Sequence, residues 1–377
     1  MMFLQLGAIP TLVISSADAA VAIFKGLGSG HDLAFSGRPT DLYVVKKISY
    51  DLNNISFAPY AITELLSSKR VQSFRTIREE EIAAIVNHID IASSSSAPYG
   101  SRGDGGTSRF YRVLHEIPLL LEEFVVSDYL LWMWWVNKLN GMETRVEKNF
   151  KELDKLYDEV IADHEDIVDV LLQLQKDARQ LITLNNQQIK GVLMDMFIAG
   201  TDTTSSALVW TFIELIRNPP LMEKVKYEVR KVGNGRDKIE ESDIPKLHYL
   251  HSVIKETLRL HPPVLLLVPR ETTKNCAIEY YEIPAKTRVI INAKSIGTDP
   301  KYLENPHEFR PDIFMTSSVD FKGQHLEFLP FGVGQRGCPG TSFAIMLLHL
   351  TVANFLNRFD WELPKGMSVE DKFQTKG

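Results

Sequence analysis

A glycine-rich loop near the C-terminal end, residues 331–340, carries one arginine and one cysteine in a stretch unsuited to a helix or a strand. An apolar pattern with helical spacing follows it directly from Thr341. Cys338 is therefore predicted to lie at a helix N-terminus with Arg336 two residues before it, and both features lower the pKa of a thiol. The loop is predicted to present a thiolate as a metal ligand.

One thiolate does not hold a bare zinc ion, because structural zinc takes four protein ligands. Cys276 is the only other cysteine of the chain, and no cysteine or histidine lies at the usual metal-ligand spacing from Cys338. Two cysteines also make no disulfide framework. An unrelated zinc or non-haem iron protein remains an alternative that lacks a ligand set. A cofactor that brings its own equatorial ligands needs only this one sulfur.

The spacing Phe-x-x-Gly-x-Arg-x-Cys-x-Gly is present in full in this loop. Its fixed positions are Phe331, Gly334, Arg336, Cys338 and Gly340. The pattern resembles the cysteine loop of the cytochrome P-450 family of haem-thiolate monooxygenases. The resemblance implies that the chain binds haem b (iron protoporphyrin IX) with an axial thiolate from Cys338. It also implies that Phe331, Gly332 and Gly340 contribute to cofactor binding.

A long helix is predicted over residues 185–218. Asn185 and Gln188 have the spacing of a capping box at its start, and two prolines follow Asn218 at its end. Residues 199–206, at its centre, are poor in helix formers and rich in hydroxyl side chains that compete for backbone hydrogen bonds. A local rule broken within a consistent helix indicates a functional position.

Gly200 and Thr203 lie three residues apart on one face of this helix, so the glycine leaves room for a flat ligand or oxygen beside a hydroxyl. The segment also resembles the oxygen-activation motif of the P-450 family. That resemblance implies that Thr203 forms a hydrogen bond with dioxygen. It further implies that Asp202 relays protons from solvent as part of a general-acid chain.

Glu256 and Arg259 lie three residues apart on a predicted helix that ends at two prolines. Such spacing alone is typical of a surface ion pair that adds little stability. The resemblance instead implies the buried Glu-x-x-Arg pair that locks the fold around the haem. The third partner of this pair in the family is an arginine, but this chain has Ile313 there. We expect that Arg310 reaches the pair or that the core is weakened.

Some segments expected in the family have no counterpart in the sequence. Tyr60 is followed at once by Ala61, where the family would show a Trp-Arg-x-x-Arg helix that holds a haem propionate. The resemblance therefore implies that Arg336 and Arg270 hold the propionates. A Gly/Ser-rich linker at residues 92–108 replaces expected helices. The last β-hairpin of the family is also missing.

The composition is that of an ordinary globular protein, with 377 residues, 44% hydrophobic and 24% charged. The patterns predict a mainly α protein with a small β portion, forming a single domain over residues 1–377. The resemblance implies a cytochrome P-450 fold, partly truncated. We expect an N-terminal β and helix part over residues 1–60 and a haem-binding core over residues 250–340.

The first fifteen residues are apolar but contain Pro10, lack a basic leader and are too short to span a bilayer. They are predicted to form a β-hairpin, followed by a helix that Ser16 caps. The membrane anchor that begins full-length plant members of the family is expected to be missing.

An apolar region around residues 124–136 contains Trp132, Trp134 and Trp135 but is interrupted by acidic residues. Two interpretations remain open for it, a buried helix pair or a surface that dips into the face of a bilayer. The net charge of −6 gives no general attraction to nucleic acid, so we expect no nucleic-acid partner.

Taken together, the resemblance implies a plant-type microsomal haem-thiolate monooxygenase. It would hydroxylate a small lipophilic substrate with O2, using electrons from NADPH through a flavoprotein, NADPH-cytochrome reductase. Its place would be the cytosolic face of the endoplasmic reticulum membrane, or a cytosolic or peripheral location without the anchor. The alternative is a shortened, non-catalytic family member that binds haem weakly or not at all.

Overall fold

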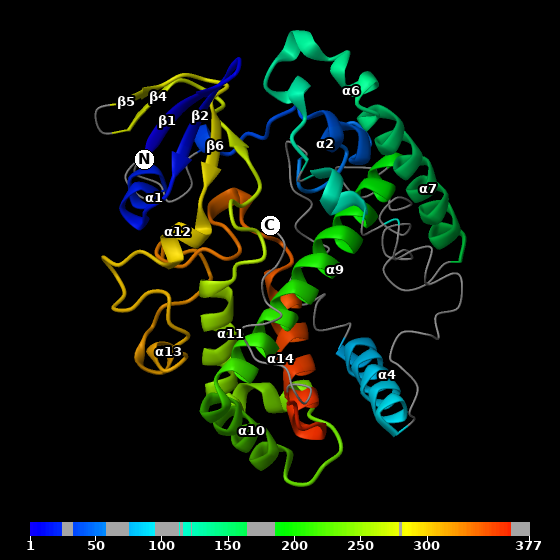
Figure 1. The fold of residues 1–377 in the computed structure, drawn as a ribbon, viewed down its shortest axis with the longest axis vertical. Coiled ribbons are helices and arrows are strands. Elements are labelled where there is room, and N and C mark those ends of the chain that lie inside the picture. Colours follow the sequence, from blue (N-terminus) through cyan, green and yellow to red (C-terminus); the bar gives the residue numbers. More distant parts are fainter. Residues whose placement is uncertain are drawn as a thin grey trace, which may run out of the picture.

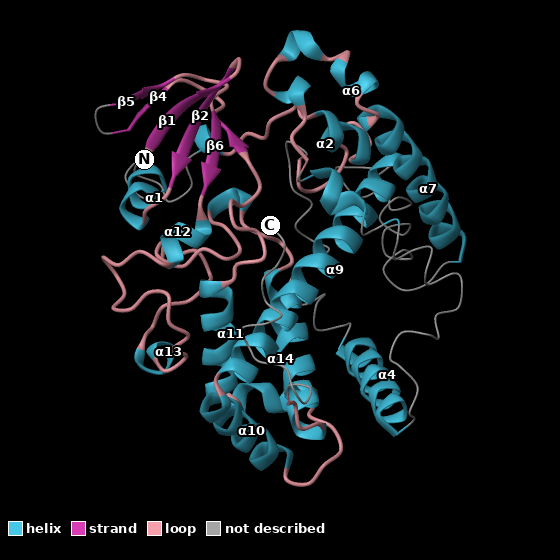
Figure 2. Ribbon diagram, viewed as in Figure 1, coloured by secondary structure: helices cyan, strands magenta, loops and turns pink. Residues whose placement is uncertain are grey.

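The computed structural model describes residues 1–24, 33–57, 75–94, 113, 116–121, 123–163, 185–278 and 281–362. Helices make up most of this part of the chain, and its strands form two small sheets (Figure 1). Figure 2 shows that the strands gather in one region while the long helices occupy the rest of the molecule. The predicted fold class, mainly α with a small β portion, is confirmed.

The larger sheet joins the N-terminal hairpin to strands from the second half of the chain. Its order is β1 (Met2–Leu6), β2 (Ile9–Ile14), β6 (Arg288–Ile291) and β3 (Arg270–Glu271). β1 and β2 are antiparallel, as predicted, whereas β2 runs parallel to β6 with Thr11 opposite Arg288. β4 (Cys276–Ile278) and β5 (Tyr281–Ile283) form the second sheet.

The described helices follow the predicted order along the chain. They are α1 (Ala17–Phe24), α2 (Tyr43–Ile48), α4 (Arg75–Ser94), α6 (Val136–Leu139), α7 (Met142–Asp163), α9 (Asn186–Arg217), α10 (Pro219–Gly233), α11 (His248–Leu260), α12 (Ala293–Gly297), α13 (Ile313–Thr316) and α14 (Thr341–Arg358). Short 3-10 turns lie at η1 (Leu33–Phe35), η3 (Val126–Asp128), η4 (Leu131–Met133), η5 (Glu241–Lys246) and η6 (Gly334–Arg336). Ser16 caps α1 as predicted, since its Oγ accepts from the Ala19 N–H at 3.3 Å.

The predicted capping box starts α9. The side chain of Asn185 accepts from the Gln188 N–H at 2.8 Å, and the Gln188 side chain accepts from the Asn185 N–H at 2.9 Å. The helix continues for 32 residues to Arg217, with Asn218 as its C-cap. These bounds confirm the helix predicted over residues 185–218.

Each half of α9 packs into a different hydrophobic core. Ile189 and Leu193 in the first half join α2 and α7, whereas Ala207 and Leu215 in the second half join α10, α11 and α14. Residues 199–202, between the two cores, are exposed. The fold therefore leaves the centre of its longest described helix uncovered.

Three predictions from the first half of the chain need correction or lie outside the described residues. The helix expected from Ala61 is described only from Arg75, and it runs on to Ser94. Residues 92–94 of the predicted linker are therefore helical. The rest of that linker, residues 95–108, and the position of the missing Trp-Arg helix after Tyr60 lie outside the described residues.

Candidate metal and cofactor site

The cysteine loop is closed by its own backbone and opens Cys338 to the surface. Its closing hydrogen bonds run from the Cys338 N–H to the Phe331 carbonyl at 2.8 Å and from the Gly337 N–H to the Gly334 carbonyl at 2.9 Å. Gly332 and Gly334 have φ angles of 71° and 67°, in the left-handed region that favours glycine. The side chain of Cys338 is exposed at the end of this loop, as a metal ligand requires.

The expected lowering of the Cys338 pKa is wrong for the protein without a metal. Packing of the surrounding chain raises the pKa of this thiol, while hydrogen bonds from Gly340 and Thr341 at the start of α14 act in the opposite direction. Arg336 does not act on the sulfur as predicted, because its Nε donates to the Ser36 carbonyl at 2.8 Å. Iron itself would have to stabilise the thiolate.

Gly340 is the N-cap of α14, and α14 packs against α9. The uncovered centre of α9 offers the space predicted beside Gly200. No atom lies within 4 Å of the position that a Cβ at Gly200 would take. The Thr203 hydroxyl donates to the Ala199 carbonyl at 2.6 Å, which leaves its lone pairs free to accept. Asp202 is exposed in the same turn.

Arg270 and Arg336 lie close together with a third arginine, Arg38, which the sequence analysis missed. Arg270 is buried and donates through Nη2 to the Val333 carbonyl at 2.6 Å. Burial lowers the pKa of Arg270 to about 10, and burial together with repulsion from Arg270 and Arg336 lowers that of Arg38 to about 9. The chain therefore holds three guanidinium groups together against their mutual repulsion.

Backbone carbonyls, rather than carboxylates, fix Arg38 in place. Its Nε donates to the Ser56 carbonyl at 2.9 Å, and its Nη1 donates to the carbonyls of Val268 at 2.8 Å and Pro269 at 2.9 Å. Among the described residues, neither Arg38 nor Arg270 forms an ion pair with a carboxylate. A cluster of desolvated cations without a paired anion fits an acidic cofactor such as a haem with its propionates.

A buried carboxylate on α9 supports the loop beside Arg38. Asp195 accepts from the Ser56 N–H and from the Asn54 side chain, both at 2.8 Å. Burial raises the pKa of Asp195 to about 6 against the effect of these hydrogen bonds. The Ser56 backbone thus connects α9 to Arg38.

The sequence contained one usable signal for Arg38, its place between Gly37 and Pro39. A Cβ on Gly37 would lie 2.5 Å from the Glu271 carbonyl oxygen, so only glycine allows this segment to pair with β3. The glycine brings Arg38 alongside the strand that carries Arg270.

Glu256 and Arg259 form a buried pair rather than a surface one. Two hydrogen bonds join their side chains at 2.6 and 2.8 Å, and each side chain is at most 3% exposed. Arg259 also donates to the carbonyls of Gly297, Pro306 and Glu308. The guanidinium and the carboxylate are thus both well supplied with partners.

The partner missing at Ile313 is replaced by backbone. The Arg310 N–H donates to Glu256 Oε1 at 2.6 Å, while the Arg310 side chain is exposed and points to the Glu304 carbonyl. The expectation that the Arg310 side chain reaches the pair is therefore wrong. A main-chain donor fills that position, so the pair does not lack a partner.

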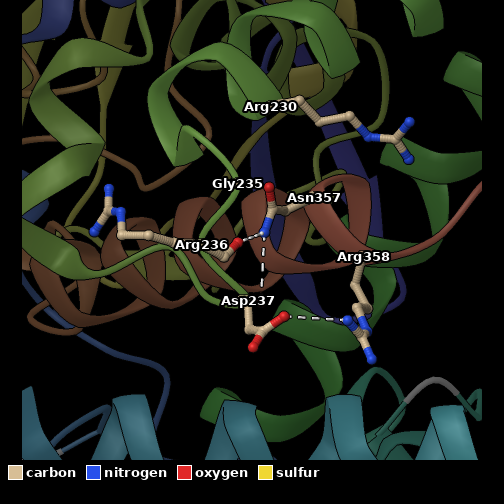
Figure 3. Close-up of a pocket in the computed structure, with 6 residues that line it drawn as sticks. All are labelled: Arg230, Gly235, Arg236, Asp237, Asn357 and Arg358. Atoms are coloured by element: carbon tan, nitrogen blue, oxygen red, sulfur yellow. Dashed lines mark hydrogen bonds and ion pairs between the residues drawn. The ribbon is translucent and has the colours of Figure 1, made fainter.

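Among the described residues, no group of three or more His, Cys, Asp or Glu side chains is arranged to hold a metal ion. A surface hollow of about 300 Å³ lies between the ends of α10 and α14. It is lined by Arg230, Gly235, Arg236, Asp237, Asn357 and Arg358 (Figure 3). Its arginines point apart, each paired with an acidic residue. We assign this hollow no role in the site.

The interpretation of residues 124–136 as a buried helix pair is wrong. Trp132, Trp134 and Trp135 are 70%, 60% and 45% exposed, on short turns rather than long helices. The Phe124 ring is also exposed and stacks on Tyr129 with centroids 4.9 Å apart. Within the described ranges, no helix combines the length and apolar character needed to cross a membrane.

Comparison with known proteins gives consistent matches over nearly the whole chain. A family model described as Cytochrome P450 matches residues 62–377. The chain is 47% identical to "Cytochrome P450 71A9" of Glycine max, over 98% of this chain and 82% of that protein. It is 45% identical to "Strychnine-11-hydroxylase" of Strychnos nux-vomica, over 98% of this chain and 80% of that protein.

The alignment with the Glycine max protein covers 413 positions, more than the 377 residues of the chain. That relative therefore contains internal segments without a counterpart here. Among solved structures, a zebra fish cytochrome P450 with progesterone matches with a TM-score of 0.77. The match covers 98% of this chain and 90% of the other at 23% identity, which shows the same fold.

Proposed function

The chain belongs to the cytochrome P450 family of haem monooxygenases, and from this premise we propose that it hydroxylates a small lipophilic substrate with O2. In this proposal NADPH supplies the electrons through a flavoprotein, NADPH-cytochrome reductase. The observation that carries the proposal is the exposed Cys338 thiol at the start of α14, a helix packed against α9 and its uncovered centre. A thiolate and an open helix face are what a flat cofactor and its substrate require.

The proposed cofactor is haem b, with Cys338 as its axial ligand. Arg38, Arg270 and Arg336 would bind the propionates, and Phe331, Gly332 and Gly340 would form the loop beneath the ring. When bound, the haem supplies the chemistry of oxygen activation. The paired Glu256 and Arg259 would keep the elements around this loop in register.

Thr203 and Asp202 are the proposed oxygen and proton groups, and Gly200 makes room beside them. A hydroxyl that donates to its own helix can also accept a hydrogen bond, and an exposed carboxylate exchanges protons with solvent. Together they would deliver protons to the oxygen side of the cofactor.

Replacing Thr203 with alanine is expected to divert most electrons from product to hydrogen peroxide, because the hydroxyl no longer directs proton delivery. A loss of general-acid catalysis of about 10²-fold or more in product formation is expected. The measurement is the ratio of product to NADPH consumed by the reconstituted haem protein. Ser205→Ala, an exposed hydroxyl two residues along, serves as the control. An unchanged ratio in Thr203→Ala would remove Thr203 from the proposed role.

The proposed substrate is small and lipophilic because of the apolar segment that follows α11. Val264, Leu265, Leu266 and Val268 are all exposed there. Strychnine-11-hydroxylase, a relative at 45% identity, is named for hydroxylation of strychnine. A substrate of comparable size with a large apolar surface is consistent with such a segment.

The rival proposal, a non-catalytic member that binds haem weakly or not at all, draws support from the internal segments absent relative to the Glycine max protein. We favour the enzyme because the arginine cluster offers an alternative hold on an acidic cofactor. Haem retention separates the two proposals.

We also propose that residues 124–136 rest on the cytosolic face of the endoplasmic reticulum membrane. Phe124 and Trp132 are exposed there, on a surface formed by η3, η4 and α6 (Figure 1). Amphipathic aromatic rings favour the membrane–water interface. This contact would bring the chain to its lipophilic substrate.

Replacing Trp132 and Trp134 together with serine is expected to weaken binding to phospholipid vesicles by about tenfold for each ring removed from the interface. Co-sedimentation with vesicles of mixed zwitterionic and anionic lipid measures it. Tyr227→Ser, which removes an exposed aromatic ring on α10, is the control. Equal binding of the double variant and the control would rule out this contact surface.

A further inference from the structure

We propose that Trp210, Glu214 and His261 position residues 262–269 against the face of α9 that carries Gly200 and Thr203. The inference rests on the proposed monooxygenase function, since it assigns that segment as a wall of the substrate pocket. These three side chains would be positioning residues that set the width of the pocket. They do not themselves touch the substrate.

The spacing of α9 places these groups on one stripe of the helix. Residues that recur at intervals of three and four lie above one another along a helix face. The stripe consists of Gly200, Thr203, Ala207, Trp210 and Glu214. A segment held by Trp210 and Glu214 therefore lies along the same face as the open space at Gly200.

His261 makes two contacts with this stripe. Its ring stacks on Trp210 with centroids 3.9 Å apart and an angle of 5° between the planes. Its Nε2 lies 2.9 Å from Glu214 Oε1, and Glu214 is buried. The stack fixes the plane of the imidazole and the carboxylate fixes its rotation, so together they leave the ring one orientation.

The backbone of His261 is where α11 ends and the next segment begins. Its N–H donates to the Thr257 carbonyl at 2.7 Å as the C-cap of the helix, and Pro262 follows directly. The proline prevents the helix from continuing. The orientation of the His261 ring thus determines the direction in which residues 262–269 leave α11.

The far end of the segment is held by the arginine cluster. Arg38 donates to the carbonyls of Val268 and Pro269, and Arg270 donates to the Val333 carbonyl in the cysteine loop. Between the two ends, Leu267 has a φ of 50° and its Cδ1 would lie 3.7 Å from a Cβ on Gly332. The segment therefore spans from the stripe on α9 to the loop that carries Cys338.

The middle of the segment makes few contacts of its own. Val264, Leu265, Leu266 and Val268 are exposed, so little packing restrains them apart from the two ends. A change at the His261 end should therefore alter the position of this apolar wall. Residues that only stabilised α11 would not produce such a localised effect.

The first test measures backbone hydrogen exchange of the purified full-length chain, with and without haem. Trp210→Leu is expected to speed exchange of residues 264–268 by about tenfold, since the stack is lost, while α14 is unaffected. Trp210→Phe, which keeps a stacking ring, should restore the slow exchange. Tyr227→Leu, on α10, is the control. Unchanged exchange in residues 264–268, or an equal increase along the whole chain, would overturn the proposal.

The second test uses ligands that coordinate the haem iron, imidazole and 1-phenylimidazole, followed by their absorbance changes. Trp210→Leu and Glu214→Gln are expected to weaken 1-phenylimidazole by about tenfold and imidazole by less than about twofold, because only the phenyl ring reaches the wall. An equal change for both ligands, or for neither, would contradict the assignment. A chain that holds no haem gives no signal here and refutes the proposed function, whereas the exchange test still decides the positioning role.

Discussion

Replacing Glu256 with glutamine is expected to lower the free energy of unfolding by about 3–5 kcal/mol, because it leaves the guanidinium of Arg259 charged and buried without its counterion. Both side chains are almost fully buried, and Glu256 also accepts from the Arg310 N–H. The pair joins α11 to the segments at Gly297, Pro306 and Glu308 through Arg259. Urea denaturation of the haem-free chain, followed by circular dichroism, measures the effect.

A matched control for this variant is Glu223→Gln. Glu223 also pairs with a cation three residues away, Lys226, but its side chain is 67% exposed. Exposed ion pairs of this kind contribute at most about 1 kcal/mol. If Glu256→Gln cost no more than Glu223→Gln, the buried pair would not hold the elements around the cysteine loop.

Replacing Arg38 and Arg270 together with glutamine is expected to weaken haem retention by about a hundredfold, roughly tenfold for each charged hydrogen bond lost. The same change should leave the free energy of unfolding of the haem-free chain unchanged or slightly higher. Each guanidinium is desolvated and repelled by its neighbours, so folding gains little from its charge. Transfer of haem to apomyoglobin measures retention, and urea denaturation measures stability.

Arg310→Gln is the control for the arginine pair, because its side chain is exposed and its backbone donor survives the substitution. It should retain haem as the unaltered chain does. A double variant that lost several kcal/mol of apoprotein stability without a separate loss of haem would identify Arg38 and Arg270 as structural residues instead.

The elements near the site were predictable from the sequence because their signals are local. The hairpin at the N-terminus, the cap at Ser16 and the capping box at Asn185 each depend on residues within a few positions of one another. The cysteine loop was predictable for the same reason, since its glycines and its closing hydrogen bonds lie within ten residues.

The rest of the site depends on contacts between distant segments, which one sequence does not reveal. Arg38 binds carbonyls more than 200 residues away, and His261 meets Glu214 on a different helix. The expected role of the Arg310 side chain was wrong because a backbone N–H fills that place. The pKa of Cys338 differs in direction because burial outweighs the helix N-terminus.

The most direct test of the central claim is the carbon-monoxide difference spectrum of the reduced, haem-loaded chain. We predict the red-shifted Soret band of thiolate-ligated haem. The band should persist in Cys276→Ala, which removes the other free cysteine, and disappear in Cys338→Ala. Absence of the band from the unaltered chain, or an equal band in Cys338→Ala, would contradict the assignment of Cys338 as the ligand of a haem monooxygenase.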